Sequence, residues 1–202
     1  MKSQVTLPEG YGEILSVDLQ KDKRLALAVN GAALVIAALM VAAGLLLRPT
    51  GFDFGEEDLT FLAVSALIAG VGSILYIILH EAVHGIFMRL FCELKPRFGF
   101  TGLYAYAGSD AYYAKTPYII IALAPVVIWG AVLLLLNILF PTYFWAIYFI
   151  QITNISGAAG DFYVTLKFTR LPSDILVRDT GVSMTVYGRC ETPSEAPAES
   201  EE

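Results

Sequence analysis

The amino-acid sequence predicts an all-α membrane protein with about four transmembrane helices, a small β-hairpin between the second and third, and a short β-containing C-terminal segment. The chain has 202 residues, of which 56% are hydrophobic and 16% charged, whereas soluble domains average about 25% charged residues. Mean hydropathy is +0.64. The apolar residues form long runs that can span a bilayer. Twelve of the thirteen lysines and arginines fall in segments that one topology places on the same side.

The first half of the chain predicts two of these helices. Residues 1–24 are polar and end in a basic cluster. The apolar run 25–47 is too long for the hydrophobic region of a signal peptide and predicts the first transmembrane helix. We interpret Asn30, a polar residue in this run, as a helix-contact residue. A second helix is predicted from about 59 to about 90, and its length brings its last turns near the membrane interface.

The second half predicts a hairpin and two further helices. Residues 98–115 alternate aromatic and small side chains around a turn, which favours a short β-hairpin at the membrane surface. A plain interfacial loop with tyrosines is the alternative. A third helix is expected from 117 to 140, with a kink at Pro125. A fourth is expected as one helix from about 142 to 168.

These elements divide the chain into one transmembrane domain and its flanking segments. The expected parts are a cytoplasmic N-terminal segment (1–24), the transmembrane domain (25–168), a cytoplasmic segment with a small strand or hairpin (169–190) and a disordered acidic tail (191–202). The basic residues predict that both termini are cytoplasmic in a multi-pass protein of the cell membrane. The sequence has no basic patch of the kind that binds nucleic acid. The lipid bilayer is therefore an expected partner, and nucleic acid is not.

The strongest functional signal lies near the end of the second helix, in His80-Glu81-Ala82-Val83-His84. Histidines four residues apart on a helix share one face and lie about 40° apart around the axis. This H-E-x-x-H pattern supplies two imidazole ligands to one Zn²⁺ and a carboxylate beside the attacking water. Glu81 is the predicted catalytic base. The alternative is a polar patch where the helix leaves the bilayer, but ionisable groups inside a membrane span are costly and usually functional.

A catalytic zinc site needs a third protein ligand. Besides Glu81, the other carboxylate on the predicted helical spans is Asp161. His84 lies five residues before Arg89, or ~7–8 Å along the helix, and Asp161 lies six residues before Lys167, or ~9 Å. Because both helices run toward the same side in the assigned topology, these depths match. We therefore predict Asp161 as the third ligand, with a buried aspartate paired to a polar neighbour as the alternative.

Asn154 shares a helix face with Asp161, two turns earlier. One interpretation is that its amide holds the substrate backbone or polarises the substrate carbonyl. The other is an interhelical hydrogen bond that stabilises the helix packing. The sequence leaves both open, so Asn154 is a tentative substrate-binding residue.

The H-E-x-x-H helix and the later segment from Asn154 to Asp161 resemble the intramembrane zinc metalloproteases of the site-2 protease type. Those enzymes carry H-E-x-x-H on one span and N-x-x-P-x-P-x-L-D-G on another. The resemblance implies that the two histidines and Asp161 bind zinc and that Glu81 is the catalytic base. In this sequence the second segment is one residue shorter, lacks both prolines and has Phe162 in place of the final glycine.

The chain is more similar to a prokaryotic family of zincin membrane peptidases. That family has a compact four-span layout, a Leu-x-Pro on the third span, here Leu123-Ala124-Pro125, and a Gly-Asp on the fourth, here Gly160-Asp161. The similarity extends over most of residues 7–190. It implies a membrane-embedded zinc peptidase.

Three functions compete at this point. The first is a zinc metallopeptidase that cleaves membrane-protein or peptide substrates near the cytoplasmic face. The second is a zinc-binding scaffold or chaperone that cleaves nothing, and the third is a metal-ion carrier. Glu81 favours the enzyme, because a structural zinc site needs no such carboxylate and would require a fourth protein ligand. Residues 98–115 could then offer an edge strand to an extended substrate.

Overall fold

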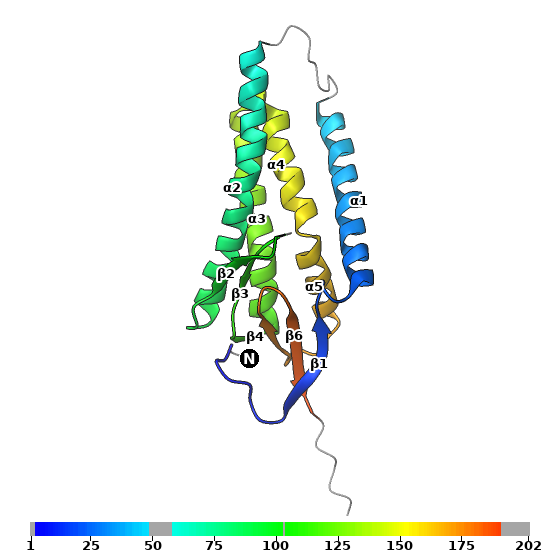
Figure 1. The fold of residues 1–202 in the computed structure, drawn as a ribbon, viewed down its shortest axis with the longest axis vertical. Coiled ribbons are helices and arrows are strands. Elements are labelled where there is room, and N and C mark those ends of the chain that lie inside the picture. Colours follow the sequence, from blue (N-terminus) through cyan, green and yellow to red (C-terminus); the bar gives the residue numbers. More distant parts are fainter. Residues whose placement is uncertain (1–2, 49–57, 103, 191–202) are drawn as a thin grey trace, which may run out of the picture.

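The computed structural model describes residues 3–48, 58–102 and 104–190. Its helices form an elongated bundle with strands gathered toward one end (Figure 1). The helices are α1 (Lys23–Leu47), α2 (Leu59–Phe91), α3 (Lys115–Leu139), η1 (Pro141–Tyr143), α4 (Phe144–Gly157) and α5 (Ala159–Thr169). The strands are β1 (Tyr11–Val17), β2 (Arg97–Phe100), β3 (Ala105–Gly108), β4 (Tyr112–Ala114), β5 (Leu176–Asp179) and β6 (Met184–Arg189).

Three helices, α1, α2 and α3, are long and apolar enough to cross a membrane. Large apolar side chains stay exposed along them, among them Leu34 on α1, which is 73% exposed. Such faces are stable when lipid, rather than water, surrounds them. The helices therefore indicate a membrane protein.

The expected single helix from 142 to 168 is wrong, because the structure breaks it into η1, α4 and α5. The break falls at Ala158, which caps α4 and precedes α5. Before it, the hydroxyls of Thr153 and Ser156 bond to carbonyls one turn back in α4, a pattern that weakens and bends helices. Neither α4 nor α5 alone has the length of a span, so the predicted count of four spans is not confirmed. The break places Asp161 in the first turn of α5.

A four-stranded sheet, in the order β1-β6-β5-β4, packs at the end of the bundle where the strands gather (Figure 1). The sequence anticipated the strands after residue 169 but missed β1, so the N-terminal segment is more than a polar lead-in. β1 pairs antiparallel with β6, and the chain before it reaches the far edge of the sheet, where Gln4 pairs with Tyr112. The predicted disordered acidic tail, 191–202, lies outside the described residues.

A two-stranded antiparallel hairpin, β2–β3, lies between α2 and α3. It is shorter than the predicted 98–115, because β4 joins the larger sheet instead. Phe98 of the hairpin packs directly on Gly85, so closely that a Cβ added there would collide with its ring. At the same open end of the hairpin, a Cβ added at Gly108 would collide with the backbone of Thr180. The first approach packs the hairpin against α2, and the second packs it against the turn between β5 and β6.

An ion-pair cluster ties this hairpin to the sheet. The Asp110 carboxylate forms ion pairs with Arg178, at 2.7 Å, and with Arg97, at 2.5 Å. The hydrogen bond from Arg178 holds the pKa of Asp110 below its usual value. Because the folded state binds the proton of Asp110 less tightly than the unfolded state, this cluster stabilises the fold above the ordinary pKa of aspartate. That contribution is lost as pH falls through the lowered pKa. The contribution is modest, since the groups are partly exposed.

The first helix is attached to the rest of the bundle mainly through α4. Only Gly44 is buried in α1, and a Cβ there would lie 2.6 Å from the ring of Tyr148. The Tyr148 hydroxyl donates a hydrogen bond to the Met40 carbonyl at 2.7 Å. At the other end of α1, space remains between this helix and α2 for the cavity described below.

Candidate metal centre

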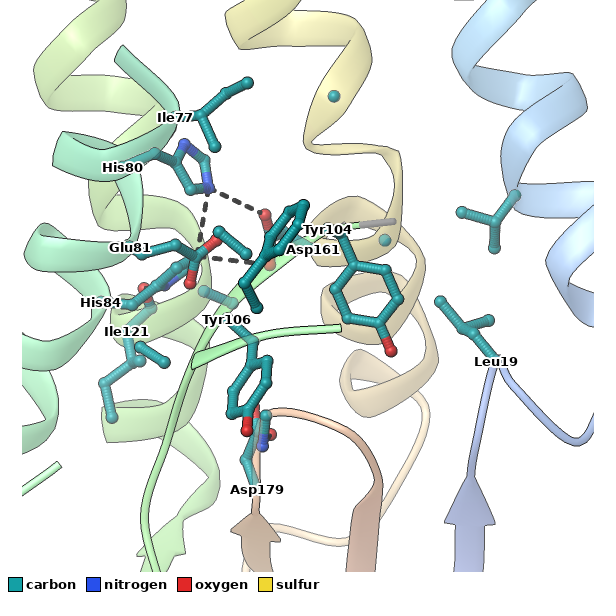
Figure 2. A pocket seen from close by; sticks show the side chains of 18 of the residues that line it. Leu19, Ile77, His80, Glu81, His84, Tyr104, Tyr106, Ile121, Asp161 and Asp179 are labelled. Atoms are coloured by element: carbon teal, nitrogen blue, oxygen red, sulfur yellow. Dashed lines mark hydrogen bonds and ion pairs between the residues drawn. The ribbon is translucent and has the colours of Figure 1, made fainter. Parts of the chain in front are cut away.

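Three side chains from two helices converge on one point (Figure 2). His80 and His84 extend from α2, and Asp161 extends from α5. The two Nε2 atoms lie 3.1 Å apart. An oxygen of Asp161 lies 3.6 Å from Nε2 of His80, and the other lies 3.8 Å from Nε2 of His84. The structure thus brings together three groups that are far apart in the sequence.

This spacing fits zinc. Two ligand atoms in tetrahedral geometry, each about 2.05 Å from one zinc ion, lie about 3.3 Å apart. The 3.1 Å between the two Nε2 atoms is close to that value, and the oxygen of Asp161 nearest to each histidine lies 3.6 or 3.8 Å away. Small side-chain rotations suffice to reach bonding distance. Two imidazoles and one carboxylate are also a donor set that catalytic zinc uses, with a fourth position left open.

The outer nitrogen of His80 is held by a chain of buried polar groups. Its Nδ1 lies 2.7 Å from the Tyr76 hydroxyl, and that hydroxyl donates to Oδ1 of Asn154 at 3.0 Å. The Asn154 amide nitrogen donates in turn to the carbonyl of Val126 at 3.2 Å. A hydroxyl that donates to Asn154 accepts from His80, so Nδ1 carries the proton and Nε2 keeps its lone pair for a metal.

The outer nitrogen of His84 is held by the backbone of α3. Its Nδ1 lies 2.9 Å from the carbonyl oxygen of Ile121. That carbonyl would normally accept the amide N–H of residue 125, but position 125 is a proline and has none. Pro125 therefore leaves free the acceptor that orients His84. Because a carbonyl only accepts, His84 must carry its proton on Nδ1, and its Nε2 also points to the metal position.

Replacing Pro125 with alanine should weaken metal binding. The alanine would supply a backbone N–H that competes with His84 for the Ile121 carbonyl, so the imidazole would lose its fixed orientation. Loss of such a supporting contact typically costs about 10–100-fold in metal affinity. Competition of the purified protein with a fluorescent zinc chelator measures this change.

Pro117 offers a matched control for this prediction. It lies in the first turn of α3, where backbone N–H groups have no partner within the helix. Pro117→Ala should therefore keep wild-type zinc affinity. Equal weakening by both substitutions would show that Pro125 acts on helix stability rather than on His84.

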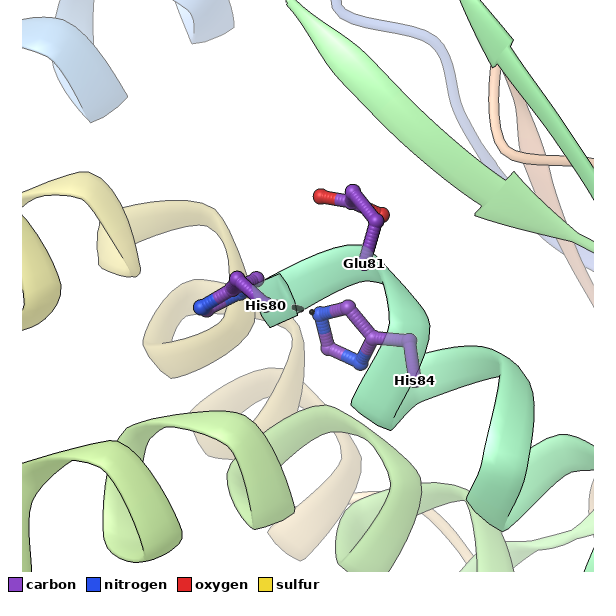
Figure 3. Close-up of side chains that lie close together, drawn as sticks. All are labelled: His80, Glu81 and His84. Carbon is purple, nitrogen blue, oxygen red and sulfur yellow. Dashed lines mark hydrogen bonds between the residues drawn. The ribbon is translucent and has the colours of Figure 1, made fainter. Parts of the chain in front are cut away.

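Glu81 lies beside the two histidines and forms a close group of possible ligands with them. It follows His80 on the same helical turn (Figure 3), and its carboxylate lies within 4.8 Å of the ligand nitrogens of both histidines. The backbone of Ala107 in β3 lies beside that carboxylate. By distance alone, Glu81 could also be the third ligand. Asp161 is the other candidate, because one of its oxygens lies 3.6 Å from Nε2 of His80 and the other lies 3.8 Å from Nε2 of His84.

These groups line a cavity of about 490 Å³ between α2, α5, the hairpin and α1. Tyr104, Ala105, Tyr106 and Ala107 form its hairpin wall, and Val29 and Asn30 come from α1. Among the described residues that line it, no side chain is a lysine or arginine, and the acidic groups are Glu81, Asp161 and Asp179. A cavity whose charged groups are carboxylates suits a divalent cation.

Asn154 is placed differently from the other predicted site residues. It is fully buried, and both ends of its amide bond to protein groups. Its contacts therefore favour support of His80 over contact with substrate. Sequence reasoning missed Tyr76, although it precedes His80 by one helical turn, and it interpreted Pro125 as a kink and as part of the Leu-x-Pro motif, not as a residue that frees an acceptor for His84. It also missed Asp179, because no local pattern places β5 at the cavity.

Comparison with known proteins gives one finding. No curated protein and no solved structure matches the chain. Residues 73–176, slightly more than half of the chain, match the family described as "Putative zincin peptidase". The matched stretch contains both histidines, Glu81, Pro125 and Asp161. The chain belongs to this zincin peptidase family.

Proposed function

We propose that the protein is a membrane-embedded zinc metallopeptidase that hydrolyses peptide bonds of membrane-protein substrates near the cytoplasmic face. The observation that carries this proposal is the convergence of His80, His84 and Asp161 beside Glu81, in a cavity between apolar helices. Membership of the zincin family supports the metal and the reaction class. The long apolar helices support a membrane setting.

The residues divide the work of hydrolysis. Zinc held by His80, His84 and Asp161 would lower the pKa of a water molecule and polarise the substrate carbonyl. Glu81 accepts one proton from the water as the water oxygen bonds to the carbonyl carbon. The C–N bond then breaks, and Glu81 returns that proton to the departing amine nitrogen. The carboxylate ends the cycle ionised, as it began.

The hairpin provides a place for the substrate backbone. Thr101 donates to the carbonyl of Tyr104 at the hairpin turn. Since hydrogen-bonded and non-bonded pairs alternate along an antiparallel ladder, Ala105 and Ala107 direct their backbone groups away from β2. Both residues line the cavity. An extended peptide paired with this edge would lie beside Glu81, because the backbone of Ala107 lies next to that carboxylate.

The proposed orientation has both termini in the cytoplasm and the protein in the cell membrane. It rests on the distribution of lysine and arginine. After Cys92 and Cys190 are replaced with serine, a single cysteine introduced at Lys95 or Arg178 should react with a membrane-impermeant maleimide only after the cells are opened. Labelling of either position in intact cells would show that the orientation is the opposite and that the site lies near the external face.

Zinc dependence tests the reaction class. The purified protein, reconstituted with a peptide substrate that contains one transmembrane segment, should cleave it. A zinc chelator should abolish cleavage, and added Zn²⁺ should restore it, because the ligands remain in place. Mass spectrometry of the products locates the cut. Cleavage that persists after complete zinc removal would point to a contaminating peptidase and count against the proposal.

A further inference from the structure

We propose that Asn30 on α1 is a substrate-positioning residue that hydrogen-bonds the backbone of the extended substrate from the side opposite β3. This inference rests on the proposed function, since it concerns how the same cavity holds its peptide. Asn30 lies outside the stretch that matches the zincin family. It also replaces the helix-contact role expected from the sequence.

The side chain of Asn30 is exposed and lines the cavity. It is the polar residue in the apolar run 25–47 of α1, and its side chain is exposed rather than packed against another helix. It lines the same cavity as His80, Glu81 and Asp161. Within the described residues, its amide has no hydrogen-bond partner. An amide left unpaired in an apolar environment is energetically costly, so a ligand in the cavity is its natural partner.

The depth of Asn30 agrees with this position. It lies six residues after Arg24, or ~9 Å along α1. Asp161 lies six residues before Lys167 on α5, also ~9 Å from a basic residue at the helix end. Because basic side chains anchor both ends at the membrane interface, Asn30 and Asp161 are level. α1 and α5 also contact one another.

A peptide bound to β3 would have unpaired backbone groups on its other edge, and Asn30 can hydrogen-bond to them. Pairing with β3 satisfies the N–H and C=O groups on one edge of the peptide and leaves those on its other edge without partners. In water they would be solvated, but between membrane helices they are costly. The asparagine side chain offers one donor group and one acceptor oxygen, which match the N–H and C=O of one substrate residue.

The competing explanation is a second copy of the protein. A lipid-facing asparagine can also join two transmembrane helices by hydrogen bonding. The cavity argues against this role, because Asn30 shares its lining with the candidate ligands. A contact between copies through Asn30 would cover a residue that lines the cavity.

The decisive experiment compares Asn30→Leu with Asn30→Gln in the full-length, zinc-loaded protein. Leucine matches the size of asparagine without its hydrogen bonds, and glutamine keeps the amide. Asn30→Leu should lower kcat/KM about 3- to 30-fold, as expected for one or two lost neutral hydrogen bonds. Most of the loss should appear in KM. Zinc content should not change, and Asn30→Gln should recover part of the activity.

A displaced amide provides the matched control. Leu39 is 65% exposed on α1, and nine residues from Asn30 correspond to about half a turn away around the helix. The double variant Asn30→Leu, Leu39→Asn keeps one asparagine on the helix but outside the cavity lining. It should be as impaired as Asn30→Leu alone. Recovery of activity in this variant would show that only the polarity of α1 matters.

Backbone substitution in the substrate tests the hydrogen bond itself. A series of substrates, each with one backbone amide near the cut replaced by an ester, removes one N–H at a time. At one position the ester should slow the wild type but have no further effect on Asn30→Leu. This non-additivity is the signature of a direct contact. Equal slowing of both proteins at every position would overturn the inference.

The controls separate the two levels of the proposal. If the wild type cleaves, Glu81→Gln does not and Asn30→Leu cleaves like the wild type, the inference about Asn30 fails while the peptidase remains. If the wild type cleaves nothing, the proposed function fails and the inference fails with it. If Asn30→Leu converts a dimer to a monomer in detergent, the partner of Asn30 is a second copy, which also overturns the inference.

Discussion

Glu81→Gln should lower peptidase activity by about 10²–10⁴-fold, the usual contribution of a general base. Glutamine keeps the size of the side chain but cannot take the proton from water. Because Glu81 is not among the three converging ligands, zinc content and fold should survive. The measurements are cleavage of a transmembrane peptide and zinc per chain by mass spectrometry.

This substitution also separates the enzyme from a scaffold. A protein that binds zinc and partners without cleaving them would show the wild-type phenotype after Glu81→Gln, and only the ligand variants would be impaired. That outcome would falsify the enzyme function. Glu93→Gln is a suitable control, because Glu93 follows the end of α2 and does not line the cavity. It should leave activity and zinc content unchanged.

Asp161→Ala should remove zinc and activity together. Two imidazoles alone hold zinc poorly, because a catalytic site depends on three protein ligands. Even supporting residues cost about 10–100-fold in metal affinity when changed, so loss of a ligand should exceed about 100-fold. Tyr76→Phe, which breaks only the support of His80, should fall within that smaller range. Zinc titration of the wild type, Tyr76→Phe and Asp161→Ala should show zinc affinity falling in that order.

The same titration decides between the two carboxylates near the histidines. If Asp161 is the ligand, Asp161→Ala loses zinc and Glu81→Gln keeps it. The reverse pattern would assign the ligand role to Glu81 and leave Asp161 as the base. Asp174→Ala serves as control, since Asp174 pairs with Arg189 at the protein surface. It removes an aspartate without touching the cavity.

Local chemistry made much of the site readable from the sequence. Helical periodicity places His80 and His84 on one face whatever surrounds them, because residues four apart always align on a helix. The apolar runs indicated membrane helices, since a bilayer demands long stretches without charge. Counting residues from the basic ends also put Asp161 level with His84. Each of these inferences uses distances along a single helix, which the sequence specifies.

Contacts between elements could not be read in the same way. The sequence identified Pro125 as a break in helical hydrogen bonding, but only the packing of α3 against α2 brings the freed Ile121 carbonyl to His84. The pairing of β1 with β6 joins the two ends of the described chain, and no local pattern encodes a partner so distant. Asn30 and β3 likewise share the cavity only through tertiary packing. The sequence determines which groups each residue can offer for hydrogen bonding. Which partner each group finds depends on the free energy of packing the whole chain. Those partners determine the geometry of the metal centre and its cavity.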